Sequence, residues 1–434
     1  MTASSPTLVR TIGRWALAGL VLNGILGSAV YGLPSVIGRD LGAGAPIAWV
    51  FAAVLIGVIV ACFAEVSSRF TGAGGPYLYV NATYGRYAGI QTGWLAYLAR
   101  LTASAGNANL FVIYLGELWP GATGRIAGIL VVAALVGGLA VVNYRGVKHG
   151  AGVSSGFAAV KLLSLAVFIA IGLAWWAGHG AVEAEPAPRD AGPWLGSLLA
   201  LVFAYGGFEA ALMPLAEAKD PRRDAPFALG AALLGVAVVY ALVQILVTAT
   251  LPAPGETERP LAAAARVYIG ASGAGFMAVC AMLSTFGYLA GGMVNVPRLT
   301  FAMAEQGDLP KPFGAVHRVF RTPFLSILLY AVLVFLLAAS GGFVQNLRIS
   351  AASRLITYGL VCAAVIVLRR RDGTASAAPP ALFRLPGGPV FAVLGVLGMA
   401  VVATQMTAGE AVILAVVVAL ATLHWWQVGR GSGF

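Results

Sequence analysis

The sequence predicts an all-α membrane protein with about twelve transmembrane helices, arranged as a 5+5 inverted repeat in which helices 1 and 6 are broken. Three observations predict this fold class. The composition is too apolar for a water-facing surface, the chain contains about twelve apolar stretches of membrane-spanning length, and two of these stretches carry glycine and proline interruptions at corresponding positions.

The composition excludes an ordinary soluble protein. Of 434 residues, 59% are hydrophobic and 10% are charged, whereas a soluble domain carries about 25% charged residues. We therefore expect lipid to cover the protein. The net charge of +11 predicts no nucleic-acid partner, because the basic residues lie in short connections between apolar runs, where they indicate membrane topology.

The cysteine and histidine residues predict no disulfide, metal site or cofactor. Cys62, Cys280 and Cys362 each lie within an apolar run and are interpreted as small buried side chains. The four histidines show no metal-ligand spacing. The sequence also shows no converging catalytic set, so we do not expect an enzyme.

The apolar stretches define a single domain over residues 1–434. They lie near residues 15–38, 43–67, 86–117, 123–144, 151–177, 193–218, 226–251, 268–297, 323–344, 349–368, 387–407 and 409–427. Each is close to the ~20 residues that a helix needs to cross the hydrocarbon core. We interpret residues 15–177 as repeat one, 193–368 as repeat two, and 387–427 as two additional helices. The first stretch is interpreted as a retained helix.

Lysine and arginine residues predict the orientation, because cytoplasmic connections are enriched in them. One set of connections holds Arg10, Arg14, Arg69, Arg86, Arg145, Lys148, Lys219, Arg222, Arg223, Arg298, Lys311, Arg318, Arg321, Arg369, Arg370 and Arg371. The opposite set holds Arg125, Arg189, Arg259, Arg266 and Arg348, together with four glutamates. We therefore expect a multi-pass protein of the plasma (inner) membrane with both termini in the cytoplasm.

The interruptions in the first and sixth stretches predict a binding site. Residues 22–34 and 203–214 each contain glycines followed by a proline about two turns later. Glycine costs about 1 kcal/mol in a helix interior and proline about 3, and lipid cannot satisfy the backbone groups that a break releases. Such residues can also merely loosen helix packing. Two breaks at matching positions instead favour a ligand site between inverted repeats.

Several segments, taken in order, resemble the amino acid–polyamine–organocation family, whose members share the fold of the sodium-coupled leucine transporter. The segments are residues 27–34, 64–65, 74–77, 143–148, 203–209, 220–223, 297–298, 302–304 and 307–310. Ala29 departs from the family pattern, which has glycine at this position. The resemblance implies a central cavity between spans 1, 3, 6, 8 and 10 that opens alternately to each side.

The resemblance and the breaks together predict the substrate contacts. We expect backbone N–H groups at the break of span 1 to bind a carboxylate, since a helix N-terminus favours an anion. Carbonyl groups at both breaks would accept from an amine, and two aromatic residues would form a lid. Met293 in span eight would give an apolar or small side-chain pocket. The expected substrate-binding residues are Asn23, Ile25, Gly27, Ser28, Ala29, Phe203, Ala204, Tyr205, Gly206 and Met293.

Ionisable residues within apolar spans need a partner or a task. Lys161 lies in span five, where the resemblance implies that its ammonium group replaces a sodium ion. A second possible role for this side chain is to release and rebind a proton during transport. The structural alternative is that the side chain extends along the helix to place its charge at the membrane surface. Arg100 lies in span three. We expect it to pair with Glu209, or second with Glu65, while direct contact with an acidic substrate is the alternative.

The predicted function is secondary active transport of amino acids by alternating access, proton-coupled or by exchange, and independent of sodium. The main alternative function is exchange of amines or polyamines. A channel is a less favoured alternative, because the sequence shows no repeated selectivity-filter residues. The predicted partners are a small-molecule substrate, the lipid bilayer and protons. The sequence leaves the oligomeric state open.

Overall fold

The computed structural model describes residues 13–71, 74–146, 150–212, 218–305, 307, 309, 311–373 and 378–431, and within these ranges the chain is helical with no strand. The first half contains α1 (Arg14–Ile25), α2 (Ala29–Leu41), α3 (Ala45–Ser67), α4 (Pro76–Tyr84), α5 (Arg86–Leu118), α6 (Arg125–Tyr144) and α7 (Gly150–His179). The second half contains α8 (Ala191–Tyr205), α9 (Phe208–Ala211), α10 (Pro221–Thr250), α11 (Pro260–Glu305), α12 (Phe324–Ser340), α13 (Phe343–Arg371), α14 (Gly388–Ala403) and α15 (Ala408–Gly431).

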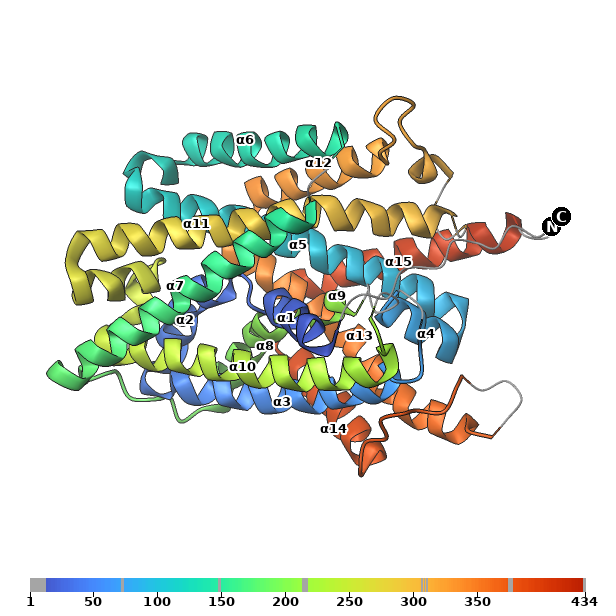
Figure 1. The fold of residues 1–434 in the computed structure, drawn as a ribbon, viewed down its shortest axis with the longest axis horizontal. Helices are drawn as coiled ribbons and strands as arrows, with labels where there is room; N and C mark the ends of the chain where they lie inside the picture. The colour runs from blue at the N-terminus through green and yellow to red at the C-terminus, as the bar shows by residue number, and fades with distance from the viewer. Residues whose placement is uncertain are drawn as a thin grey trace.

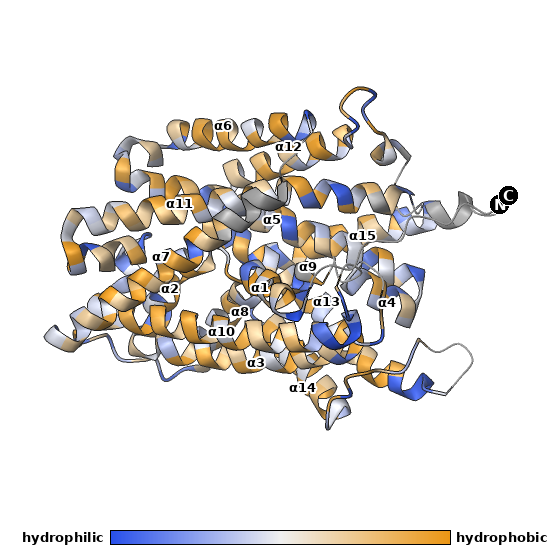
Figure 2. Ribbon diagram, viewed as in Figure 1, coloured by the Kyte–Doolittle hydropathy of each residue, from blue (hydrophilic) through white to orange (hydrophobic). Residues whose placement is uncertain are grey.

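The distribution of side chains is that of a multi-pass membrane protein. Among the described residues, seven helical segments are long and apolar enough to cross a membrane, and α8, α12 and α14 are shorter apolar helices. Orange covers most of the helical surface in Figure 2, and blue is found mainly in loops and at helix ends. Large apolar side chains such as Ile126 and Leu234 point outwards, whereas Glu65 and Arg354 are buried. The count of twelve spans and the inverted repeat stay predictions.

The structure interrupts both helices that the sequence predicts to be broken. The first apolar stretch ends as α1 at Ile25 and resumes as α2 at Ala29. The sixth ends as α8 at Tyr205 and resumes as the short helix α9 at Phe208. The sequence-predicted motif positions 147–148, 213–214, 308 and 310 lie outside the described residues.

The broken helices lie in the middle of the bundle. Figure 1 shows α1, α8 and α9 near the centre of the view, with long helices running alongside them. The helix α10 packs against α1 and α3, α13 packs against α5 and α8, and α11 packs against α5 and α7. Helices α6 and α12 pack against each other at one edge. This arrangement surrounds the exposed backbone of the breaks with protein.

Two arginine–carboxylate pairs fix one end of the bundle. Arg369, near the end of α13, donates to both carboxylate oxygens of Glu65 at 2.7 and 2.6 Å, and the N–H of Leu385 donates to the same carboxylate at 2.9 Å. Arg69 binds both oxygens of Asp372 at 2.6 and 3.1 Å. These hydrogen bonds lower the pKa of the Asp372 carboxyl below its usual value of 3.8. Bidentate arginine–carboxylate pairs of this kind fix the relative orientation of the two side chains and also stabilise the fold.

Candidate functional site

The two breaks lie directly against each other because one residue between them is a glycine. Gly207 has a φ of +109°, and a Cβ at this position would lie 2.3 Å from the carbonyl oxygen of Gly24 in α1. Any other residue would combine an unfavourable backbone conformation with a backbone collision. A Cβ at the neighbouring Gly206 would instead meet the guanidinium group of Arg354, which belongs to a side chain and not to the backbone.

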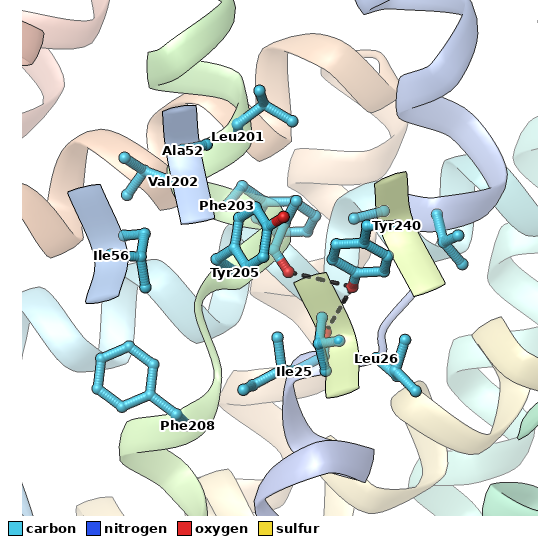
Figure 3. Packing of buried hydrophobic residues seen from close by; sticks show 14 of the residues in the cluster. Ile25, Leu26, Ala52, Ile56, Leu201, Val202, Phe203, Tyr205, Phe208 and Tyr240 are labelled. Atoms are coloured by element: carbon cyan, nitrogen blue, oxygen red, sulfur yellow. Dashed lines mark hydrogen bonds between the residues drawn. The ribbon is translucent and has the colours of Figure 1, made fainter. Parts of the chain in front are cut away.

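Tyr240 on α10 bridges the ends of the two broken helices. Its hydroxyl group contacts the carbonyl oxygens of Ile25, at 2.9 Å, and Ala204, at 3.2 Å. Figure 3 shows the tyrosine between the two breaks, with dashed lines marking these contacts. Its ring also packs edge-on against Trp49 and Tyr205. The one hydroxyl hydrogen of Tyr240 can therefore be donated to, or shared between, carbonyl groups at the ends of both broken helices.

Lys161 on α7 binds the break in the first span. Its ammonium group donates to the carbonyl oxygen of Leu26 and, at 3.2 Å, to the side-chain oxygen of Asn23. Only 6% of the residue is exposed. The side chain therefore points inwards to the break, and does not snorkel to the surface.

Arg354 on α13 binds the break in the sixth span. Its Nε lies 3.3 Å from a carboxylate oxygen of Glu209, and its NH1 donates to the carbonyl oxygen of Phe203 at 3.3 Å. The other oxygen of Glu209 accepts from the hydroxyl of Tyr358 at 2.9 Å and from the N–H of Gly207 at 2.8 Å. Each carboxylate oxygen of Glu209 thus has a neighbouring donor, so the side chain is fixed beside the break.

A cavity of about 170 Å³ lies beside the two breaks. It is smaller than the roughly 300–1,000 Å³ of pockets for drug-sized ligands, so it suits a small metabolite. The polar and charged residues in its wall are Asn23, Arg100, Ser104, Lys161, Glu209, Ser284, Tyr288, Asn295 and Arg354. Arg100, Glu209 and Arg354 also line a second, smaller cavity that reaches Pro76 and Tyr77 at the start of α4. These three residues lie at the boundary between the two cavities.

The sequence-predicted charged residues come together in this wall. Lys161, Arg100 and Glu209 all line the cavity, although they lie on α7, α5 and α9. Glu65 does not, because Arg369 and the N–H of Leu385 bind its carboxylate. Glu65 is thus paired with Arg369, and the pairing of Arg100 with Glu209, or second with Glu65, stays a prediction.

The residues predicted to bind a carboxylate lie at the start of α2. Gly27 has space around it, since a Cβ there would meet only the carbonyl oxygen of Ile25, at 3.7 Å. Ser28 is 1% exposed, and its hydroxyl has no hydrogen-bond partner within the described part of the chain. Ala29 is 2% exposed. The first turn of a helix leaves N–H groups without intrahelical acceptors, so a polar ligand has donors here.

The carbonyl groups predicted to receive an amine already accept hydrogen bonds from the protein. Tyr240 contacts those of Ile25 and Ala204, and the N–H of Gly206 donates to that of Phe203 at 3.1 Å. Arg354 adds a second donor to the Phe203 carbonyl. Each carbonyl has two lone pairs, so a carbonyl that accepts from a single protein donor can still accept a further hydrogen bond.

The predicted lid and pocket residues lie mainly in the core. Tyr205 is buried, and its hydroxyl donates to the carbonyl of Trp49 at 3.0 Å. Phe203 lies under the guanidinium of Arg354, with 5.6 Å between the carbon and the ring centre. Met293 packs in a separate apolar cluster with side chains from α5, α6 and α12, while Gly292 reaches the cavity wall. The substrate roles of all three stay predictions.

Sequence reasoning missed Arg354 and Tyr240. Arg354 is a charged residue inside the apolar stretch 349–368, and the rule that singles out Lys161 and Arg100 also applies to it. Tyr240 gives no comparable signal, because aromatic residues in spans usually pack or face lipid.

A family comparison agrees with this geometry. The family model described as "Amino acid permease" matches residues 12–423, which is nearly the whole chain. The protein is a member of the amino acid permease family. Its family and relatives are transporters and not enzymes.

Relatives of the permease cover most of its length. It is 29% identical to the serine/threonine exchanger SteT of Bacillus subtilis, over 94% of each chain. It is 26% identical to the methylthioribose transporter of the same organism, over 90% of this chain and 87% of the relative. It is 29% identical to the mouse large neutral amino acids transporter small subunit 2, over 83% of this chain and 71% of the relative.

Proposed function

We propose that the permease carries an amino acid across the plasma membrane by alternating access, with the substrate bound in the cavity beside the two breaks. The observation that carries this proposal is the contact between two broken helices at a small cavity with a polar, charged wall. Broken backbone within a membrane helix is tolerated where it lines a cavity or binds a ligand. Membership of the permease family and the names of the relatives support an amino acid as substrate.

The start of α2 would hold the α-carboxylate of the substrate. Gly27 leaves space for the ligand. The backbone N–H groups of Ser28 and Ala29 would supply donors, with the Ser28 hydroxyl as one more. The N–H of Gly27, which donates to the Ile25 carbonyl at 2.6 Å, would join them by exchanging that acceptor for the ligand. The positive end of the helix dipole favours the same charge. The α-amine would use the carbonyl lone pairs that remain at the breaks.

Lys161 would replace a sodium ion. Its ammonium group already binds the Leu26 carbonyl and Asn23, so it supplies a positive charge at the break of the first span. Two unit charges ~4 Å apart repel by about 4 kcal/mol at an effective dielectric of 20, which would weaken cation binding about a thousandfold. Transport would then run by proton coupling or exchange, and the name of the serine/threonine exchanger among the relatives supports exchange.

Flux through proteoliposomes tests this function. The purified permease would be loaded with one amino acid, and uptake of a labelled amino acid would be measured with sodium or choline outside, with and without an inward acid gradient. We expect saturable counterflow that is equal in choline. Stimulation by the gradient would indicate proton coupling. A strict requirement for sodium would overturn the role of Lys161, and unsaturable flux would overturn a carrier.

A pair of lysine variants connects this flux to the site. Lys161→Ala is expected to lose most transport while substrate binding survives in part, because the variant removes the charge at the break. Lys219→Ala is the matched control, since Lys219 is exposed outside the bundle core. Equal activity of the two variants would show that the buried ammonium group has no part in the transport cycle.

A further inference from the structure

A further cavity, of about 350 Å³, lies between α5, α12, α15 and the end of α11. Its described lining residues include no Asp, Glu, Lys or Arg, and most of them are apolar. The apolar side chains include Leu309, Phe313, Leu329, Leu333, Leu420 and Leu423. Because ionised groups are costly in an apolar site that does not pair them, the occupant of this cavity differs in chemistry from the amino acid proposed for the cavity beside the breaks.

The mouth of the cavity opens onto the membrane-facing surface of the bundle. Leu420 and Leu423 line the cavity and are nevertheless 46% and 57% exposed. The surface next to them is also apolar, since Leu328 precedes the lining residue Leu329 and Val416 lies one turn before Leu420, and both are exposed. Lipid tails are as apolar as these side chains and cover such a surface. The nearest molecule that can enter the mouth is therefore a lipid.

Two buried donors in the cavity wall have no hydrogen-bond acceptor within the described part of the chain. They are the indole N–H of Trp94 and the hydroxyl of Tyr97, one turn apart on α5. Thr300, in the same wall, instead donates to the carbonyl oxygen of Pro297 at 2.9 Å. An indole N–H can only donate, and a buried donor without an acceptor lowers stability. The occupant should therefore combine an apolar body with hydrogen-bond acceptors.

The two donors lie near an end of the bundle where aromatic side chains gather. The ring of Trp94 lies 6.0 Å from that of His424, and the next two residues on α15, Trp425 and Trp426, are exposed. The exposed ring of Tyr87 packs edge-on against Trp425. Exposed tryptophan and tyrosine residues are typical of the membrane–water interface. The ester carbonyl groups of phospholipids lie at this interface, and they accept hydrogen bonds but do not donate them.

We propose that this cavity binds one acyl chain of a phospholipid from the surrounding bilayer, and that ester carbonyl oxygens of the lipid accept hydrogen bonds from Trp94 and Tyr97. The volume agrees with this occupant. An apolar cavity of about 150 Å³ holds benzene, so about 350 Å³ holds roughly a dozen carbon atoms, which is most of an acyl chain. The inference goes beyond the proposed function and does not depend on which substrate is carried.

The bound chain would support the wall of a cavity on the substrate side. Gly93 lines both the apolar cavity and the smaller polar cavity that reaches Arg100 and Glu209. A Cβ at Gly93 would lie 2.6 Å from the terminal methyl group of Met303, which also lines the apolar cavity. An acyl chain in the cavity would pack against Met303 and hold it over Gly93. We therefore expect the lipid to stabilise the packing of α11 against α5.

Lipid binding by the intact permease tests the inference. The detergent-solubilised protein is delipidated and then given dioleoyl phosphatidylcholine or its diether analogue, which has the same head group and chains but no ester carbonyl. Native mass spectrometry measures the bound lipid, and thermal unfolding measures its effect on stability. We expect the ester lipid to bind about fivefold more tightly, because one neutral hydrogen bond contributes about that factor, and to raise the melting temperature more. Equal binding of the two lipids would overturn the ester contact, and binding of oleate without either phospholipid would overturn the occupant.

Variants show whether this cavity is the binding site. Leu333→Trp should fill the cavity and abolish lipid retention, whereas Tyr97→Phe removes only the hydroxyl donor and should reduce the preference for the ester lipid. Leu328→Trp is the matched control, because Leu328 lies on the same helix and is exposed outside the cavity lining. Wild-type retention by a folded Leu333→Trp protein would overturn the site, and an unchanged preference in Tyr97→Phe would overturn the hydroxyl contact. If Leu333→Trp does not fold, Leu423→Trp at the mouth replaces it, and unchanged retention there would overturn the site equally.

Discussion

Replacing Gly207 with alanine should separate the two broken helices. The change adds one methyl group at a position with a φ of +109°, where the new Cβ would lie 2.3 Å from the backbone oxygen of Gly24. A flexible side chain could move away from such a contact, but the obstacle here is a backbone carbonyl. Either α1 or α9 must therefore shift.

The size of the effect follows from two costs. A non-glycine residue in a sparsely populated backbone region costs about 1–3 kcal/mol, and overpacking a tight contact costs about 1–3 kcal/mol more. We therefore expect Gly207→Ala to destabilise the permease by about 2–6 kcal/mol, towards the lower end if α9 moves. Moving α9 would also displace the Glu209 carboxylate from the Gly207 N–H and Tyr358, so substrate binding should be lost as well.

Thermal unfolding of the detergent-solubilised protein, followed together with ligand-induced stabilisation, measures both effects. Gly230→Ala is the matched control, because a Cβ at Gly230 in α10 meets nothing within 4 Å. The control should unfold at the wild-type temperature or slightly above, since alanine favours a helix. A Gly207→Ala protein with wild-type melting temperature and wild-type binding would refute the close contact between the two breaks.

Three further outcomes are expected. Gly27→Leu should abolish substrate binding without unfolding the protein, because the leucine side chain would fill the space beside the break. Calorimetry would measure the binding, and wild-type affinity in the folded variant would contradict the assignment of this site. A double-mutant cycle of Arg100→Gln and Glu209→Gln should show that the double variant loses less stability than the two single variants added; additive losses would argue against their pairing. Arg69 lowers the pKa of the Asp372 carboxyl in the folded protein. The pair therefore stabilises the folded state fully above about pH 4, which is the pKa of an aspartate in an unfolded chain. This stabilisation decreases as the pH falls through the pKa of Asp372 in the folded protein. The melting temperature of Asp372→Asn should thus approach that of the wild type on acidification, and a constant difference would contradict the pair.

The breaks could be predicted from the sequence because their cause is local. Glycine weakens a helix wherever it occurs, and the stretches around Gly27 and Gly206 carry that signal without reference to any partner. The sequence also favoured an inward position for Lys161, because a charge deep within an apolar span is costly unless it has a partner. Short helices such as α4 carry no such signal, because nine residues between two spans show no distinctive period.

Partners could not be predicted, because they depend on how distant helices pack. Glu209 and Arg354 are 145 residues apart in number, and the sequence offers Arg100 as an equally reasonable partner. For the same reason the sequence does not show which of the released carbonyl groups contact donors from the protein. A single chain shows where backbone groups are released, but not that Tyr240 on another helix reaches them.

The cations at the two breaks support the predicted inverted repeat. In that repeat, span five is equivalent to span ten and span one to span six. Lys161 on the fifth span binds the Leu26 carbonyl at the break of the first, and Arg354 on the tenth binds the Phe203 carbonyl beside the break of the sixth. Each half thus satisfies its broken helix with a cation from its last helix.

This correspondence has a consequence for the transport cycle. Hydrogen bonds from charged groups contribute about 1.5–3 kcal/mol each. A motion that separates α7 from α1, or α13 from α8, would break such a bond, and another interaction of similar free energy would have to take its place. A carboxylate that enters the cavity can accept from the released cation and supply that replacement. An empty cavity cannot, because the carbonyl would lose its donor and the cation would lose its acceptor. If the transport cycle separates these helices, we therefore expect the movement to depend on substrate.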